Sequence, residues 1–207
     1  MKLFKQFSLS NLSLTVRFLT VSDAVLSVGL GLFGPIFAIY ITQQIETENI
    51  LGVIGIGTSI YLFMRSIGQM PLAIIIDKIK GEKDDFYVLL TGSIIFIIVP
   101  ILYIFISEVW HLFAIQFIYG LGAALVSPTW LAIFTRHIDK GKEGLEWGIY
   151  QTTVDMSGAI AAPIGGFIAS LYGFTAVMIS ASIIATISSI FIFAIRDDLR
   201  LKNKPNK

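Results

Sequence analysis

Residues 49–76 read NILGVIGIGTSIYLFMRSIGQMPLAIII, an apolar run with one charged residue, Arg65, near its middle. A helix of this length is long enough to cross a bilayer, which takes about 20 apolar residues. A charge at mid-depth costs roughly 2.5 to 3.5 kcal/mol, so it usually faces a cavity or a partner rather than lipid. Asp23 and Asp155 interrupt other apolar runs in the same way. These three residues are therefore candidate functional groups.

The composition of the whole chain indicates a membrane protein. Its 207 residues are 55% hydrophobic and 14% charged, whereas an ordinary soluble domain has about 25% charged residues. Since Leu171-Tyr172-Gly173 offers a turn inside the last long apolar run, we expect six helices. The expected limits are 18–42, 50–78, 86–106, 110–136, 146–170 and 174–195, with a polar tail over 196–207. The predicted fold is all-α, a single six-helix transmembrane domain over residues 1–207 without a soluble domain.

The basic residues predict the orientation of the helices. Lys and Arg accumulate on the cytoplasmic side of short loops. Apart from Arg65, every Lys and Arg lies near the N-terminus, around the loops 78–83 and 136–142, or in the C-terminal tail. The loops 43–50, 107–109 and 171–173 contain none. We therefore predict a multi-pass protein of the cell (plasma or inner) membrane, with both termini and the tail in the cytoplasm.

Several classes of function lack their residues in this chain. The net charge of +1 gives no reason to expect a nucleic-acid partner. Without cysteine there are no disulfides or thiolate metal sites, and His111 and His137 lie at opposite ends of one expected helix. The segment Gly57-Thr58-Ser59-Ile60-Tyr61 lacks the second Gly of a Gly-x-Ser-x-Gly protease site, and no phosphate-binding loop occurs. We expect no enzyme, no metal and no cofactor.

The two halves of the chain share landmarks at a nearly constant offset. In the first helix, Gly29 and Gly34-Pro35 match Gly122 and Ser127-Pro128 of the fourth, 93 residues later. The pairs in the second and fifth helices, offset by 90 to 92 residues, are Arg65 and Asp155, Gly68 and Gly158, and Pro71 and Pro163. The first helix leaves the cytoplasm and the fourth returns to it, so we predict a 3+3 inverted repeat, which is typical of transporters.

Three segments carry a family resemblance when taken with this arrangement. They are the loop Asp77-Lys78-Ile79-Lys80-Gly81-Glu82-Lys83, the segment QFIYGLGAA over 116–124, and the segment GAIAAPIGG over 158–166. They resemble, in order, the loop between helices 2 and 3, helix 4 and helix 5 of the major facilitator superfamily. The chain is similar to the amino-terminal six-helix half of such a transporter over nearly its whole length. Ala73 and Ala162 stand where the family usually has Gly, and Gln116 stands where it has Arg.

The resemblance implies a secondary-active transporter that works by alternating access in the lipid bilayer, with a small-molecule substrate near the midplane between two six-helix bundles. This chain supplies one bundle. We expect a homodimer or a separate second half, unless the chain is a fragment that ends where the family's central loop begins. Coupling to a proton or another ion is possible, but in the family's drug/proton antiporters it is implied for the Arg that Gln116 replaces. The alternative is a non-transporting assembly or sensor protein with a half-transporter fold.

Individual residues receive roles from their position and from this resemblance. Arg65 holds an anionic substrate or a mobile carboxylate, or else pairs statically with Asp155 or with helix carbonyls. The candidates for substrate binding or coupling are Arg65, Asp155, Asp23, Gln116, Trp130, Tyr61 and Gln151. Asp77 and Lys78 form a cytoplasmic gate with Arg136 or a helix end, or are part of a solvated loop.

The remaining expectations concern small and aromatic residues. The residues expected to let helices pack closely or rock are Gly120, Gly122, Gly158, Pro163, Gly165 and Gly166. Trp110 and Trp147 are expected at the membrane interfaces, where tryptophan is enriched.

Overall fold

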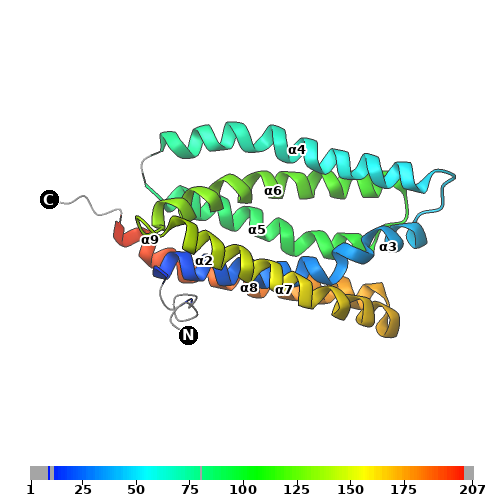
Figure 1. Cartoon of the computed structure of the whole chain (residues 1–207). Helices are drawn as coiled ribbons and strands as arrows, with labels where there is room; N and C mark the ends of the chain where they lie inside the picture. Colours follow the sequence, from blue (N-terminus) through cyan, green and yellow to red (C-terminus); the bar gives the residue numbers. More distant parts are fainter. Residues whose placement is uncertain (1–8, 10–11, 80, 203–207) are drawn as a thin grey trace.

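The structure, a computed structural model, describes residues 9, 12–79 and 81–202 of the chain. Its elements are α2 (Leu14–Phe33), η2 (Gly34–Ile36), α3 (Phe37–Gln44), α4 (Ile50–Lys78), α5 (Lys83–Ile104), α6 (Val109–His137), α7 (Glu143–Tyr172), α8 (Phe174–Ala194) and α9 (Arg196–Lys202) (Figure 1). Within the described residues there is no strand. The expected all-α fold is confirmed.

Six segments are long and apolar enough to cross a membrane: Leu14–Gln44, Ile50–Lys78, Lys83–Ile104, Val109–His137, Glu143–Tyr172 and Phe174–Leu199. The first is interrupted at Gly34-Pro35, where three residues of 3-10 helix join α2 to α3. Proline lacks a backbone N–H and so interrupts the regular ladder of helix hydrogen bonds. Gly173, with φ of 81°, is the single residue between α7 and α8. The expected turn at 171–173 therefore takes its shape from a glycine.

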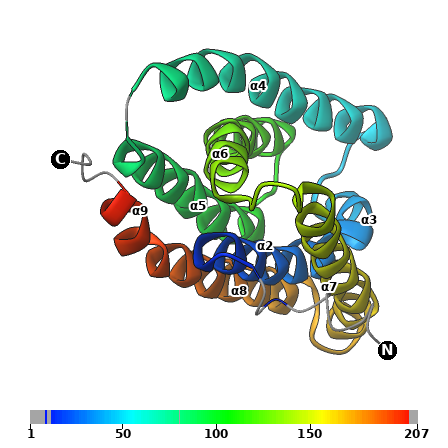
Figure 2. The same ribbon diagram turned by 60° about the vertical axis from the view of Figure 1, so that its left-hand side comes forward.

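The helices pack in pairs that obey the expected inverted repeat. α6 contacts α4 and α5, while α2 contacts α7 and α8 (Figure 2). In the repeat α6 corresponds to α2, so each of these pairs has a counterpart. The small residues agree: a Cβ on Gly122 would lie 2.7 Å from Ile95, and one on Gly29, 93 positions earlier, would lie 3.3 Å from the Ala181 carbonyl oxygen.

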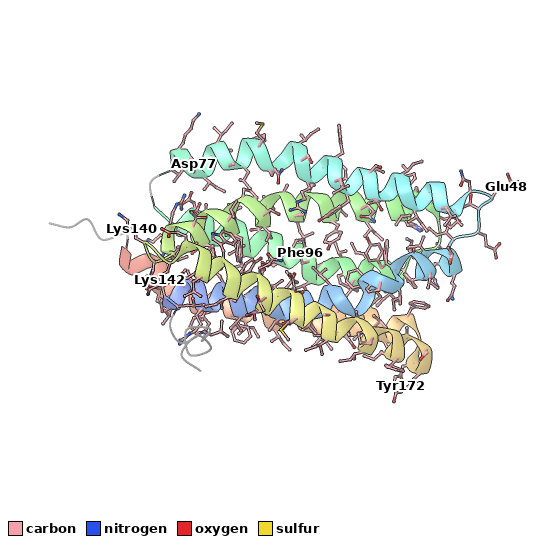
Figure 3. All side chains as sticks on the ribbon, in the orientation of Figure 1. Glu48, Asp77, Phe96, Lys140, Lys142 and Tyr172 are labelled. Atoms are coloured by element: carbon pink, nitrogen blue, oxygen red, sulfur yellow. The ribbon has the colours of Figure 1, made fainter. Side chains whose placement is uncertain are left out.

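The two ends of the bundle differ in charge. The start of α2 and the end of α9 lie at the same end, here called the terminal end (Figure 1). Asp77, Lys140 and Lys142 also lie there, whereas Glu48 and Tyr172 lie at the opposite end (Figure 3). That the terminal end faces the cytoplasm stays a prediction from the positive-inside rule.

The first part of the expected polar tail is a helix. α9 packs against the terminal end of α2, α5 and α8, and its Leu199 is buried. The Thr15 hydroxyl of α2 donates a hydrogen bond to the Asp198 carboxylate. Residues 203–207 of the tail lie outside the described residues.

Candidate functional site

A cavity of about 920 Å³ lies between α2, α4, α6 and α7. Phe96 of α5, in the middle of the bundle (Figure 3), also lines it. Its lining comes from residues 23–30 of α2, 61–73 of α4, 119–131 of α6 and 147–154 of α7. In α4, α6 and α7, and in the first span Leu14–Gln44 taken as a whole, the lining segment lies largely in the half nearer the terminal end. At the other end, an apolar cluster that includes Tyr40, Ile41, Tyr103 and Leu112 fills the interior. This cavity therefore lies toward the terminal end of the bundle.

Arg65 lines this cavity from near the middle of α4. It forms no ion pair with any residue in the part of the chain that the structure describes, so the expected static partner, Asp155, is not observed. Tyr61 lies one turn away on the same helix face and also lines the cavity. Its ring lies against that of Tyr119, tilted by 34° and with 4.7 Å between centroids. Arg65 and these two tyrosines therefore line the same cavity.

Asp23 lines the cavity from α2, as a charge in an apolar run suggested. The Tyr150 hydroxyl of α7 donates to Asp23 Oδ2 at 2.7 Å. One turn further along α2, the Ser27 hydroxyl donates to the Val154 carbonyl oxygen at 2.9 Å. These two bonds join α2 to α7 along the cavity. The sequence prediction had named neither Tyr150 nor Ser27.

Asp155 and Gln116 do not line the cavity, so the expectation that Gln116 lies in its wall is not met, and a role of Asp155 in coupling stays a prediction. The cavity face of α7 is Trp147, Tyr150, Gln151 and Val154, with i, i+3, i+4, i+7 spacing, and Asp155 lies about 100° around the helix from Val154. It is exposed and accepts a hydrogen bond from the Gln151 amide at 2.9 Å. Gln116 is buried because α4 approaches it closely at Gly57, where a Cβ would lie 3.5 Å from Gln116 Cγ.

The two tryptophans at the terminal end belong to one aromatic cluster. Trp130 lines the cavity as expected; it stacks on Phe134 at 4.6 Å between centroids and lies tilted against Tyr150 at 4.7 Å. Trp147 also lines the cavity and lies 4.6 Å from the Phe134 ring. Trp147 thus contributes to the cavity wall near the start of α7, and its place at the membrane interface stays a prediction.

The ion pair at the terminal end differs from the expected gate. Arg136 Nη1 lies 2.5 Å from Asp85 Oδ2, and the Asp85 side chain is fully buried. Asp77 and Lys78 are exposed at the end of α4 and pair with no residue of the described chain, so the predicted pairing with Arg136 is not formed. Asp85 is the partner of Arg136 instead, because the start of α5 lies beside the end of α6. In the next loop, a hydrogen bond from Lys142 to Asp139 raises the pKa of Lys142.

Of the six residues expected to let helices pack closely or rock, four lie at close helix contacts. A Cβ on Gly120 would lie 2.6 Å from the Tyr61 carbonyl oxygen, and one on Gly165 would lie 1.8 Å from the Leu32 carbonyl oxygen. Gly122 and Gly158 are similarly confined, against Ile95 and Ser27. Gly166 has no neighbour within 4 Å of its Cβ position, and Pro163 is exposed. Gly166 therefore has room for a side chain, and Pro163 lies on the exposed surface of α7.

Comparison with known proteins gives one family. Residues 19–207 match the model of the Major Facilitator Superfamily. The chain is 26% identical over 146 residues to an uncharacterized MFS-type transporter of Methanocaldococcus jannaschii, covering 70% of this chain and 36% of that protein. It is 24% identical over 160 residues to the multi-drug resistance efflux pump PmrA of Streptococcus pneumoniae, covering 76% and 39% respectively.

A solved structure shares the fold. The crystal structure of the POT family transporter PepTSo superposes with a TM-score of 0.70 at 14% identity, over 88% of this chain and 37% of that one. The chain therefore spans well under half the length of the relatives it matches.

Proposed function

The chain belongs to the major facilitator superfamily, a family of multi-pass membrane transporters rather than enzymes, and we propose that it forms one six-helix half of a secondary-active transporter. In this proposal it moves a small solute by alternating access across the cell membrane, with both termini in the cytoplasm. Because one relative is named an efflux pump, the proposed direction is outward. The observation that carries the proposal is the cavity of about 920 Å³, lined by Arg65 and Asp23 and hollow toward the terminal end.

A second six-helix unit completes the proposed transporter. The cavity lies between α4 and α7, which form its two rims. These two spans have the smallest share of buried residues in their apolar windows, 6% and 11%. The halves of this family are parallel repeats about an axis along the membrane normal, so a second copy in the same orientation, or a separate second half, would face the cavity. Such an assembly would enclose the substrate between two bundles.

The assembly can be tested by cross-linking, because the chain has no cysteine of its own. Cysteines at the exposed positions Met70 of α4 and Gln151 of α7, which line opposite rims of the cavity, should together give a disulfide between α4 of one copy and α7 of the other in membranes. A cysteine at Phe193, exposed on α8 away from the rims, is the control and should give none. If only monomers form while flux persists, the homodimer is excluded, and a separate half or a single bundle remains.

The transport proposal is tested by flux into proteoliposomes. The purified chain is screened for counterflow of amino acids, sugars, organic anions and organic cations, with Arg65→Ala beside the parent chain and Lys140→Ala as an exposed control. We expect at least a tenfold loss of flux in Arg65→Ala, because the mid-membrane charge is the site's main polar contact, and no loss in Lys140→Ala. Flux that Arg65→Ala leaves unchanged would remove this residue from the site.

The competing candidate is a non-transporting assembly or sensor protein. Gln116 and Ala73 in place of the family's usual Arg and Gly favour it, since a fold alone does not determine a function. Absence of flux for every class of solute, by the chain alone and with any unit that co-purifies with it, would decide for this candidate.

A further inference from the structure

The cavity has one cationic and one anionic side chain, and only one of them is engaged. Among the residues that line it, Arg65 is the single base and Asp23 the single acid. Asp23 accepts the Tyr150 hydroxyl bond at 2.7 Å. Arg65 has no carboxylate within ion-pair distance anywhere in the described chain. Its charge is therefore the one that remains available to a ligand.

The chemistry of a guanidinium restricts what that ligand is. Arg presents five N–H donors in a planar fork and accepts nothing. This fork matches the two oxygens of a carboxylate or the oxygens of a phosphate, and the bonds are strongest when both partners are charged. A cationic ligand would meet repulsion from Arg65 and an acid, Asp23, that already has a partner.

The rest of the lining favours a flat apolar body. The aromatic residues that line the cavity are Tyr61, Phe96, Tyr119, Trp130, Trp147 and Tyr150. Tyr61 is one turn from Arg65 and its ring lies 4.7 Å from that of Tyr119, which in turn contacts Phe96 edge-on at 5.5 Å. Aromatic rings attract one another in offset or edge-to-face arrangements. A ring attached to the anionic group would lie against these side chains.

We propose that the cavity binds an organic anion, with a carboxylate or similar oxyanion on Arg65 and an aromatic body against Tyr61, Phe96 and Tyr119. This inference rests on the proposed transport function for its biological meaning, and it names the substrate class of that site. The binding step itself needs no transport, so the two can be tested separately.

The test compares three ligands with one ring and three charges: naphthalene-2-carboxylate, naphthalene-2-carboxamide and 2-naphthylmethylammonium. Their binding to the full chain in lipid nanodiscs is measured by calorimetry, with the heat from empty nanodiscs subtracted. We expect the carboxylate to bind at least tenfold more tightly than the carboxamide, and the ammonium most weakly. Arg65→Gln should remove this tenfold preference while the carboxamide affinity stays the same, and Arg65→Lys should keep part of it.

The controls separate a lost site from a lost fold. Lys140→Gln removes a charge from an exposed loop and should leave all three affinities unchanged. If Arg65→Gln does not fold, Arg65→Lys and the ligand series on the parent chain still test whether the cavity prefers the carboxylate. Tightest binding of the ammonium, binding of none of the three, or a carboxylate affinity unchanged in Arg65→Gln would overturn the inference. Charge-selective binding without flux would instead contradict only the transport function.

Discussion

Two helix interfaces occupy equivalent positions in the repeat but are held together differently. α2 and α7 approach through Gly31, Gly158 and Gly165, and the Ser27 and Tyr150 hydroxyls add two hydrogen bonds between the helices. α4 and α6 also approach through small residues, at Gly57, Gly68 and Gly120. No side-chain hydrogen bond joins α4 to α6 in the described chain. The rim formed by α2 and α7, here called the bonded rim, is thus joined by hydrogen bonds as well as by packing. The rim formed by α4 and α6 is held by side-chain packing.

Because its described residues form no side-chain hydrogen bonds between helices, the α4–α6 rim should be easier to displace than the α2–α7 rim. Only Gly57 and Ile76 are buried along the whole of α4, and the helix packs mainly on α6. Helices in a membrane associate through close packing and hydrogen bonds rather than through a hydrophobic driving force. A rim without hydrogen bonds therefore separates at lower cost. We expect α4 to be the moving rim and the α2–α7 pair to be the fixed one.

The largest effect is expected at Gly165. In Gly165→Ala the new methyl would lie 1.8 Å from the Leu32 carbonyl oxygen, so the bonded interface must open. Overpacking of this severity costs about 3 kcal/mol. Thermal unfolding in detergent should show a strongly lowered midpoint. Gly166→Ala, with no neighbour within 4 Å of the new methyl, is the matched control and should keep the parent midpoint or raise it. Equal midpoints for the two variants would contradict the account of this interface.

A smaller effect is expected at the equivalent interface. In Gly120→Ala the methyl would lie 2.6 Å from the Tyr61 carbonyl oxygen, but α4 can move outward without breaking a hydrogen bond. We expect about 1 to 2 kcal/mol of destabilisation. Gly55→Ala, on the open side of α4, is the control. A loss in Gly120→Ala as large as in Gly165→Ala would show that the two rims are equally fixed.

The smallest effect is expected when a single bond between α2 and α7 is removed. Tyr150→Phe deletes the donor to Asp23 and should cost about 1 kcal/mol, the usual net contribution of one hydrogen bond. Tyr119→Phe removes a hydroxyl that makes no hydrogen bond within the described chain, and its unfolding midpoint should stay the same. If Tyr150→Phe also left the midpoint unchanged, the bond from Tyr150 to Asp23 would contribute nothing to the stability of this rim.

Much of the fold could be predicted from the sequence because a bilayer imposes simple requirements. Apolar length predicts six spans, and the shared positions of Gly29 and Gly122 predict matching contacts that the structure contains. Arg65 and Asp23 could be identified as cavity residues because a charge in an apolar run needs a polar neighbour or water.

The rest depends on how each helix is rotated, which the sequence does not determine. Asp155 satisfied the same criterion as Asp23, yet it lies on the next face of α7 from the cavity, where it accepts a hydrogen bond from Gln151. Nothing in the sequence marked Tyr150 as the partner of Asp23, since a tyrosine in a membrane helix usually indicates only an apolar ring with a polar tip. Asp85 lies just before the expected third helix (86–106), and only the contact of α5 with α6 shows that it is buried against Arg136.

Transport by alternating access requires the cavity to be a water-filled passage that opens to each compartment in turn. Ser66 lines the cavity, whereas its neighbour Ile67 is exposed on the outer surface of α4. Because the chain has no cysteine, Ser66→Cys and Ile67→Cys can each be labelled with a membrane-impermeant maleimide in right-side-out and inverted vesicles. We expect Ser66→Cys to be labelled in both preparations and Ile67→Cys in neither. Reaction of Ser66→Cys from one side only, or from no side, would contradict alternating access.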